Sequence, residues 1–196
     1  MRRRVEATHL LRIAMGRGVP AIVLAAGESS RLGQPKALVE VDGIPLAAHA
    51  VRRLIEGGAD PIWIVTRQDL VADLALRCPE ANVVVNPNPD AGRTGSIQHG
   101  IMSVIREQGR PPEKLLIAPV DRIGFESSTV ARVLQETGTC HPVPAGHPVL
   151  LDAMDCAQVL TSSPDAPLRD IIDSQPIVAP GRHLNIDHPS DLEALE

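Results

Sequence analysis

Short apolar runs that alternate with helical segments most constrain the fold of this 196-residue chain. The runs are bounded by turn-forming or polar residues, which is typical of buried strands. We predict strands at 21–25, 61–65, 82–85 and 115–120, a small strand at 38–41, and helices at 45–56, 68–77 and 96–108. Strands that alternate with helices predict βαβ units and a mostly parallel sheet, with the loops after Ala25, Val85 and Val120 at one edge. Ligands of such sheets bind at that edge.

The region after residue 125 is expected to complete the same domain. It contains a predicted helix at 127–136, a proline-rich crossing at 141–148, a strand at 149–151 and a final helix after Asp187-His188-Pro189-Ser190. We find no repeat, low-complexity tract or linker, so residues 20–196 are interpreted as one α/β domain. Residues 1–19 are expected to be an N-terminal extension, either a frayed helix or the product of a start assigned upstream of Met15.

The composition excludes several classes of function. The formal net charge is -5, and the chain has one tryptophan, one phenylalanine and no tyrosine. A nucleic-acid binder needs a basic surface and usually aromatic stacking platforms, and a choline site needs an aromatic cage, so neither is expected. No apolar run reaches the roughly 18 residues that a membrane span needs, and no signal peptide is recognisable. We therefore expect a cytoplasmic protein that binds neither nucleic acid nor membrane.

The cysteines provide no framework for a disulfide or a metal. Cys78, Cys140 and Cys156 are odd in number, far apart, and without a CxxC or Cys/His ligand spacing. We expect them to be reduced thiols in the interior of an intracellular protein.

The loop that follows the first predicted strand is the main candidate for a functional site. Residues 24–36 read LAAGESSRLGQPK, which combines small residues with hydroxyls and with the cations Arg31 and Lys36. Small residues let backbone N–H groups approach a phosphate, and the cations neutralise it. The loop is not a Walker A motif, because five residues rather than four separate Gly27 from Gly33. Lys36 is one of only two lysines beside 17 arginines, which favours a role for a compact charge, although a flexible polar turn is the alternative.

This loop resembles the signature of the MobA-like nucleotidyltransferases, in which LAAG or LAGG precedes a Ser, an Arg, a Gly and a Lys. Three further segments resemble the family in the same order along the chain: NPNPDAGRTGSIQHGI at 86–101, LLIAPVDRIGF at 115–125, and GHPVLL at 146–151 followed by NIDHPSDLEAL at 185–195. The resemblance covers residues 20–196. It implies a three-layer α/β/α sandwich of the Rossmann-like nucleotide-diphospho-sugar transferase type, also called GT-A-like.

The resemblance also implies roles for the residues of the nucleotide half. The catalytic cations would be Arg31 and Lys36, which hold the triphosphate and stabilise charge at the α-phosphorus. The residues that line the nucleotide would be Leu24, Ala25, Ala26, Gly27, Gly92 and Ser96. Simpler alternatives are a surface arginine for Arg31, a solvated lysine for Lys36, and a helix N-cap for Ser96.

Two carboxylates are expected to bind Mg²⁺. Asp121 directly follows a buried apolar strand, where a carboxylate is costly unless it meets a cation or N–H groups. Mg²⁺ with substrate phosphates suits such a carboxylate. Asp187 is the second ligand by its place in the family motif, and a helix N-cap is its alternative role.

The identity of the acceptor is harder to predict. Ala26 and the GHPV string resemble the molybdenum cofactor cytidylyltransferase branch, which implies CTP, a molybdopterin acceptor, and a molybdoenzyme or its maturation factor as a partner. His147 and Arg122 are weaker candidates for contacts with the acceptor, and a buried, hydrogen-bonded structural histidine is the alternative for His147.

Two departures from the family lie on the acceptor side. Arg122-Ile123 stands where relatives carry a Met, Gln or His and then Pro, which would put a bulky cation beside the metal. The stretch between Gln135 and Gly146 is also short. These departures leave open a transferase for a sugar or polyol phosphate, or an inactive nucleotide-binding chaperone or regulator.

Overall fold

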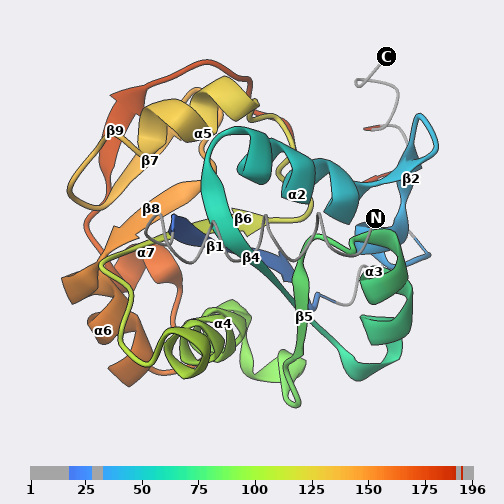
Figure 1. Ribbon diagram of the computed structural model, residues 1–196, viewed down its shortest axis with the longest axis horizontal. Helices are drawn as coiled ribbons and strands as arrows, with labels where there is room; N and C mark the ends of the chain where they lie inside the picture. The colour runs from blue at the N-terminus through green and yellow to red at the C-terminus, as the bar shows by residue number, and fades with distance from the viewer. Residues whose placement is uncertain (1–17, 28–32, 189–190, 192–196) are drawn as a thin grey trace, which may run out of the picture.

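The computed structural model describes residues 18–27, 33–188 and 191, and shows one seven-stranded sheet and a separate hairpin (Figure 1). Across the sheet the strands are β5 (Asn82–Val85), β4 (Ala59–Thr66), β1 (Val19–Ala25), β6 (Lys114–Pro119), β8 (Val149–Asp152), β7 (Cys140–Val143) and β9 (Gln175–Val178). The first four are parallel, β8 is antiparallel to both β6 and β7, and β9 is parallel to β7. The hairpin pairs β2 (Glu40–Val41) with β3 (Ile44–Pro45). The predicted mostly parallel sheet is therefore confirmed.

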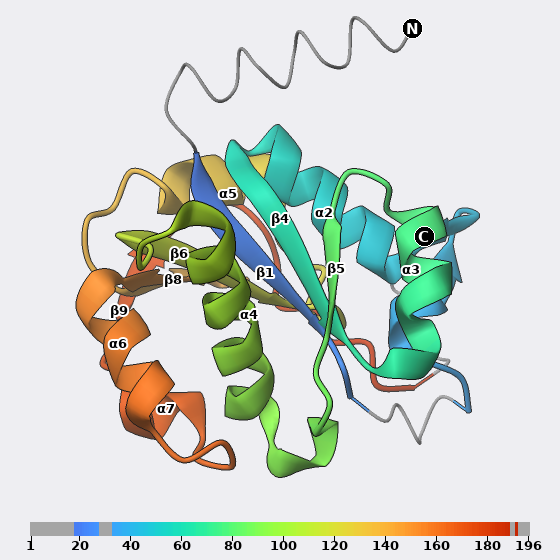
Figure 2. The ribbon, with the colours of Figure 1, turned by 60° about the horizontal axis from the view of Figure 1, so that its bottom comes forward.

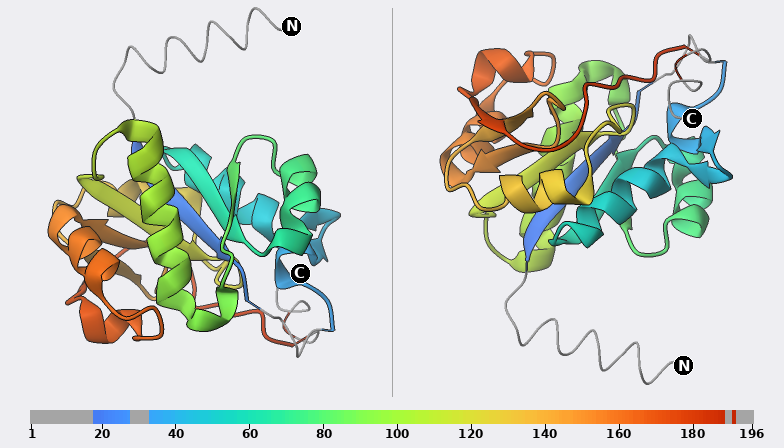
Figure 3. Two further views of the ribbon diagram at one scale, coloured as in Figure 1. Left: turned by 90° about the horizontal axis from the view of Figure 1, so that it is seen from below. Right: turned by 90° about the horizontal axis from the view of Figure 1, so that it is seen from above.

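Helices cover both faces of the sheet, so the three-layer prediction is confirmed as well (Figure 2). On one face lie α2 (Leu46–Glu56), α3 (Val71–Arg77) and α5 (Ser127–Val133); on the other lie α4 (Arg93–Gln108), α6 (Ala153–Thr161) and α7 (Leu168–Ile171). Short 3-10 turns are η2 (Lys36–Leu38), η3 (Gln68–Leu70) and η4 (Pro89–Ala91). Figure 3 shows the two helical layers from opposite sides. Within the described part of the chain, no helix combines the length and the apolar character that crossing a membrane requires.

Strand β1 shows why the sheet needs helices on both faces. Successive side chains of a strand point to opposite faces, and every residue from Ala21 to Ala25 is buried. Ala21, Val23 and Ala25 pack into the core beneath α2 and α5, whereas Ile22 and Leu24 pack into the core beneath α4. A strand that is apolar on both faces is typical of the centre of a parallel α/β sheet.

The carboxyl ends of the parallel strands meet at one edge, as predicted. Hydrogen bonds extend the ladder past the strand ends: the Val120 amide donates to the Leu24 carbonyl at 3.0 Å, and the Asn86 amide donates to the Thr66 carbonyl at 2.8 Å. The loops that follow β1 and β6 therefore start side by side, and the loop after β5 starts beside the end of β4 on the same edge.

Several predicted boundaries are wrong. The predicted helix at 96–108 begins at Arg93, the helix at 127–136 ends at Val133, and the proline-rich crossing at 141–148 overlaps the strand β7. The final helix after Ser190 and the N-terminal extension fall on segments outside the described residues, apart from Gly18, Val19 and Asp191.

The cysteines match their prediction as buried thiols. Cys78, Cys140 and Cys156 are all free and buried. Burial raises the pKa of Cys78 and of Cys140 to about 11, and that of Cys156 to about 12. These thiols stay protonated near neutral pH and are poor candidates for nucleophiles or metal ligands.

Candidate active site

A cavity of about 370 Å³ opens at the carboxyl ends of β1 and β6. Nine of the site residues predicted from the sequence line it, namely Leu24, Ala25, Ala26, Gly27, Lys36, Gly92, Ser96, Asp121 and Asp187. These residues come from four separate parts of the chain. Arg31, the second predicted catalytic cation, lies outside the described residues.

Small, anchored residues form the floor of this cavity. Ala25 and Ala26 are buried, and the Thr66 hydroxyl donates to the Ala25 carbonyl at 3.2 Å. A Cβ placed on Gly27 would meet no described atom within 4 Å. The start of the loop is thus held to the sheet while space remains above its backbone, as a phosphate-binding loop requires.

Lys36 lies between the two predicted metal ligands. Its Nζ is 3.1 Å from Asp121 Oδ2 and 2.5 Å from Asp187 Oδ1. The side chain of Lys36 is only 14% exposed, and those of Asp121 and Asp187 are 17% and 32% exposed. Partial burial strengthens the interactions among the three charges, because less water screens them.

A close contact between two distant segments brings the carboxylates together. The amide of Ile186, which is fully buried, donates to the Asp121 carbonyl at 2.9 Å, and the Arg182 amide donates to the Gly124 carbonyl at 2.9 Å. A Cβ on Gly124 would lie 1.9 Å from the Arg182 carbonyl oxygen, so this approach requires glycine. The segment that carries Asp187 is thereby positioned beside the end of β6.

The donor atoms fit a hard divalent cation. Two carboxylates converge on one point, and the adjacent Asn185 amide donates to Asp187 while its own buried Oδ1 has no hydrogen-bond partner among the described residues. No group of three His, Cys, Asp or Glu side chains suited to a metal occurs in the described chain. A site with two protein carboxylates and further oxygens from phosphates and water is characteristic of Mg²⁺ rather than of zinc.

The start of α4 forms another wall of the cavity. Its N-cap is Gly92, with φ of 125°, where a Cβ would lie 2.4 Å from the Pro164 carbonyl oxygen. Ser96 is therefore not the N-cap, and that alternative is wrong. Its buried hydroxyl instead accepts a hydrogen bond from Asn86 Nδ2 at 3.0 Å, which ties α4 to the loop after β5.

A second cavity, of about 760 Å³, adjoins the first. Leu24, Arg93 and Pro119 line both cavities. His147, a weak candidate for an acceptor contact, lines the second cavity. Arg122 lines neither cavity, since its guanidinium lies 2.9 Å from His183 Nε2.

His147 is held neutral in this cavity. Burial lowers its pKa to about 4, assisted by the charges of Arg122 and Arg93 and opposed by Asp121 and by a hydrogen bond with the Ile117 backbone. Its buried Nδ1 has no hydrogen-bond partner within the described chain. The burial of His147 and its hydrogen bond with Ile117 are compatible with the alternative of a structural histidine, and the buried Nδ1 is compatible with a contact to the acceptor.

Sequence reasoning did not identify Arg93 as a site residue. It directly follows Gly92, and the helix was expected to begin three residues later, which would have left Arg93 in a loop. The signal was present in the sequence, because Arg93 is the only Lys or Arg of the 86–101 segment and directly follows Gly92.

Comparison with known proteins decides the family. The model of the MobA-like NTP transferase domain matches residues 21–179. The chain belongs to this family. That MobA-like match runs from within β1 to just past β9, includes Asp121, and ends before Asp187.

Similar proteins are named for different nucleotidyltransferase activities. A 2-C-methyl-D-erythritol 4-phosphate cytidylyltransferase from Rhodococcus opacus is 33% identical over 128 residues, 63% of this chain and 54% of that protein. A probable molybdenum cofactor guanylyltransferase from Nostoc is 52% identical over 46 residues, 24% of this chain and 22% of that protein. The chain thus spans about half or less of the length of these curated relatives. A solved nucleotidyl transferase from Methanothermobacter has a TM-score of 0.72 and 20% identity, covering 92% of this chain and 96% of its own, and shares the fold.

Proposed function

We propose that this protein is a Mg²⁺-dependent nucleotidyltransferase that transfers a nucleoside monophosphate, preferably CMP from CTP, to a phosphorylated acceptor and releases pyrophosphate. The observation that carries the proposal is the position of Lys36 between Asp121 and Asp187, at the mouth of a cavity floored by Ala25, Ala26 and Gly27. Membership of the MobA-like family supports the same class of reaction.

The chemistry needs positioning and charge more than a proton acceptor. An oxygen of the acceptor phosphate attacks the α-phosphorus, a new P–O bond forms, and the bond to the bridging oxygen breaks as pyrophosphate leaves. A phosphomonoester is already largely ionised near pH 7, so no general base is required. Asp121 and Asp187 would hold Mg²⁺, which would neutralise charge on the phosphate oxygens. Lys36, released from the carboxylates, would pair with the triphosphate and stabilise the leaving group.

Sequence motifs and relatives indicate which nucleotide and which acceptor the protein uses. Ala26 and the GHPV string favour CTP and a molybdopterin acceptor, with a molybdoenzyme or its maturation factor as partner. The Rhodococcus relative, named for a polyol phosphate, supports the alternative acceptor class. Arg122 lines neither cavity, which counts against the hypothesis that its charge makes the protein inactive.

A pyrophosphate-release assay tests the proposal. CTP, GTP, ATP and UTP are each combined with Mg²⁺ and with molybdopterin, sugar phosphates and polyol phosphates, and we expect release with CTP and molybdopterin. Asp121→Asn should lower kcat by about 100-fold or more, whereas Asp69→Asn, at an exposed ion pair with Arg67, should not change it. NTP binding without turnover in every combination would show that the protein is not a transferase.

A further inference from the structure

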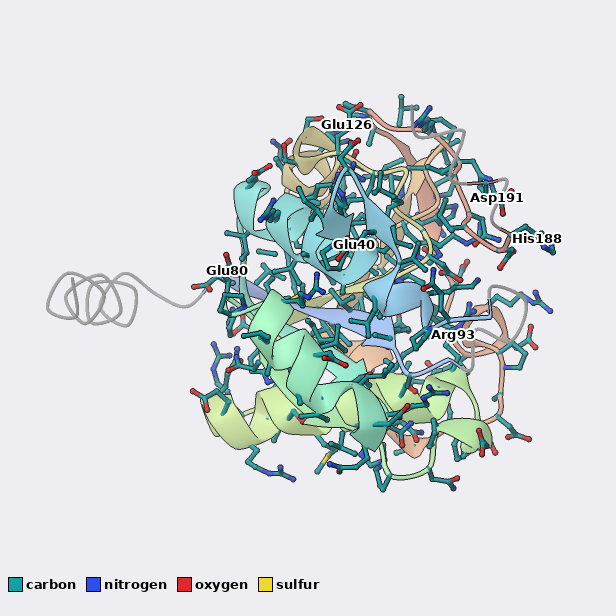
Figure 4. All side chains as sticks on the ribbon, turned by 90° about the vertical axis from the view of Figure 1, so that its right-hand side faces the viewer. Glu40, Glu80, Arg93, Glu126, His188 and Asp191 are labelled. Atoms are coloured by element: carbon teal, nitrogen blue, oxygen red, sulfur yellow. The ribbon has the colours of Figure 1, made fainter. Side chains whose placement is uncertain are left out.

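Arg93 occupies the boundary between the two cavities. It is the first residue of α4, and of the three residues that line both cavities it is the only charged one, beside Leu24 and Pro119. Figure 4 shows it on the side of the molecule that also carries His188, next to Asp187 in the chain. A group that reacts with a nucleotide in the first cavity must pass this boundary if its body lies in the second.

The charge of Arg93 is not neutralised within the described chain. The structure gives its guanidinium no ion pair or hydrogen bond there, and the first turn of α4 contains no acidic residue. The acidic residues that line the second cavity have other contacts: Asp165 accepts a hydrogen bond from Ser163, and Asp173 accepts one from Gln175 at 3.5 Å. The other arginine of that cavity, Arg169, pairs with Asp170 at 3.7 Å.

The second cavity has an apolar wall. Its large aliphatic side chains are those of Leu24, Ile97, Ile117, Val149, Leu168 and Ile172. The buried Nδ1 of His147 offers one hydrogen-bonding position without a partner in the described chain. A polyhydroxylated body would leave hydroxyls unpaired against this wall, and each buried unpaired hydroxyl is costly. A ring system or another largely apolar body fits the wall better.

We propose that Arg93 is the positioning residue that binds the phosphate of the acceptor, and that the acceptor is a phosphomonoester with a ring-bearing or largely apolar body seated against Ile97, Val149 and Leu168. This inference rests on the proposed function, because it needs a nucleotide in the first cavity. Arg93 binds the phosphate dianion at the boundary between the cavities, so that this phosphate lies next to the nucleotide in the first cavity. The planar guanidinium can donate hydrogen bonds to two phosphate oxygens at once.

Calorimetric titration of two probes tests this assignment. Phenyl phosphate represents an apolar body and glycerol 3-phosphate a polyol, and each is titrated into the protein loaded with Mg²⁺ and α,β-methylene-CTP, which cannot transfer its nucleotidyl group. We expect phenyl phosphate to bind more tightly, and Arg93→Met to weaken it about tenfold or more while the Kd of the CTP analogue changes less than about twofold. Arg106→Met removes the same charge from the last turn of α4 and should leave both affinities unchanged.

Other outcomes overturn the assignment. If Arg93→Met and Arg106→Met change the Kd of phenyl phosphate equally, Arg93 does not bind the acceptor phosphate. If Arg93→Met weakens binding of the CTP analogue alone, Arg93 binds the nucleotide instead. Glycerol 3-phosphate binding as tightly as phenyl phosphate would refute the apolar body. If the wild-type protein does not bind the CTP analogue at all, the proposed nucleotidyltransferase function is refuted. Titration of phenyl phosphate without nucleotide then still shows whether Arg93 binds a phosphate.

Discussion

Lys36 holds the two carboxylates of the candidate metal site, so its removal should affect metal binding and turnover in opposite directions. In Lys36→Met the ammonium no longer competes with a divalent cation for Asp121 and Asp187, and we expect Mn²⁺ to bind more tightly in the absence of nucleotide. The same variant should lose about 100-fold or more in kcat, because charge on the leaving pyrophosphate is less stabilised. Electron paramagnetic resonance of Mn²⁺ and a pyrophosphate assay measure the two effects.

The second lysine of the chain is the control for this experiment. Lys114 Nζ donates to the carbonyls of Leu134 and Glu136, far from the cavity. Lys114→Met should therefore alter neither Mn²⁺ affinity nor kcat. Weaker Mn²⁺ binding in Lys36→Met would contradict competition between the ammonium and the metal.

His147 predicts a pH dependence of stability. Its folded-state pKa of about 4 lies below the ordinary value of 6.5, so between these values the unfolded chain binds a proton that the folded chain does not. The free energy of unfolding should therefore fall as the pH drops from about 6.5 to 4, by up to about 3 kcal/mol from this group. Urea unfolding of the wild type and of His147→Gln at pH 7 and pH 4.5 measures the difference. If the free energy of unfolding falls equally in the wild type and in His147→Gln between pH 7 and pH 4.5, His147 is not held neutral in the folded protein.

Single residues differ in how far the sequence could predict them. Lys36 and Asp121 were recognisable because the residues around each carry a local chemical pattern. The partners of Lys114 were not, since a lysine that donates to main-chain carbonyls 20 and 22 residues away leaves no pattern in side-chain types. Arg93 was missed because its role depends on two cavities meeting, which is a property of the folded chain.

At the scale of elements, the start of α4 depends on one glycine. Gly92→Ala would combine a positive φ with a Cβ 2.4 Å from the Pro164 carbonyl oxygen, so α4 or the 164–165 segment must shift. We expect a loss of about 2 kcal/mol or more in the free energy of unfolding, and weaker binding of α,β-methylene-CTP because Gly92 lines the first cavity. Chemical denaturation and calorimetry measure these two effects.

The other end of the same helix offers a matched control. Gly109 also has a positive φ, of 71°, but a Cβ there would meet no described atom within 4 Å. Gly109→Ala should cost only the backbone strain, about 1 kcal/mol, without any change in nucleotide affinity. If Gly92→Ala and Gly109→Ala lose equal free energy of unfolding, contact with Pro164 does not determine where α4 starts.

The elements of the parallel half were predicted more successfully than those of the other half. Strands β1, β4 and β6 have continuous apolar stretches because both of their faces are buried, and the edge strand β5 has a shorter apolar stretch that is only partly buried. Strand β7 contains Pro142, which suggests a crossing rather than a strand. It tolerates the proline because its only paired residue on the β8 side is Cys140, at one end.

At the scale of the whole molecule, the two halves of the sheet have different roles. The parallel half supplies the cavity floored by Ala25 and Ala26, and its loops carry the family motifs, so the nucleotide site was foreseeable. The antiparallel half with β8 and β7 contributes to the second cavity, whose wall includes Val149 and the α7 residue Leu168 beside residues of β1, α4 and β6. That cavity forms from segments that are distant in sequence, and only its GHPV segment was recognisable as a motif, so the rest of its lining could not be predicted.

Because one cavity draws on four parts of the chain, nucleotide binding should stabilise the whole fold. At a free concentration 100 times its Kd, α,β-methylene-CTP with Mg²⁺ should add about 2.7 kcal/mol, which corresponds to a rise in Tm of about 5–10 °C. The rise should be smaller with EDTA, since Mg²⁺ would bridge the phosphates to Asp121 and Asp187, and Asp121→Asn should show the smaller rise even with Mg²⁺. Differential scanning calorimetry at matched ligand concentrations measures both, and a rise that is the same with Mg²⁺ and with EDTA would contradict the metal site assigned to these two carboxylates.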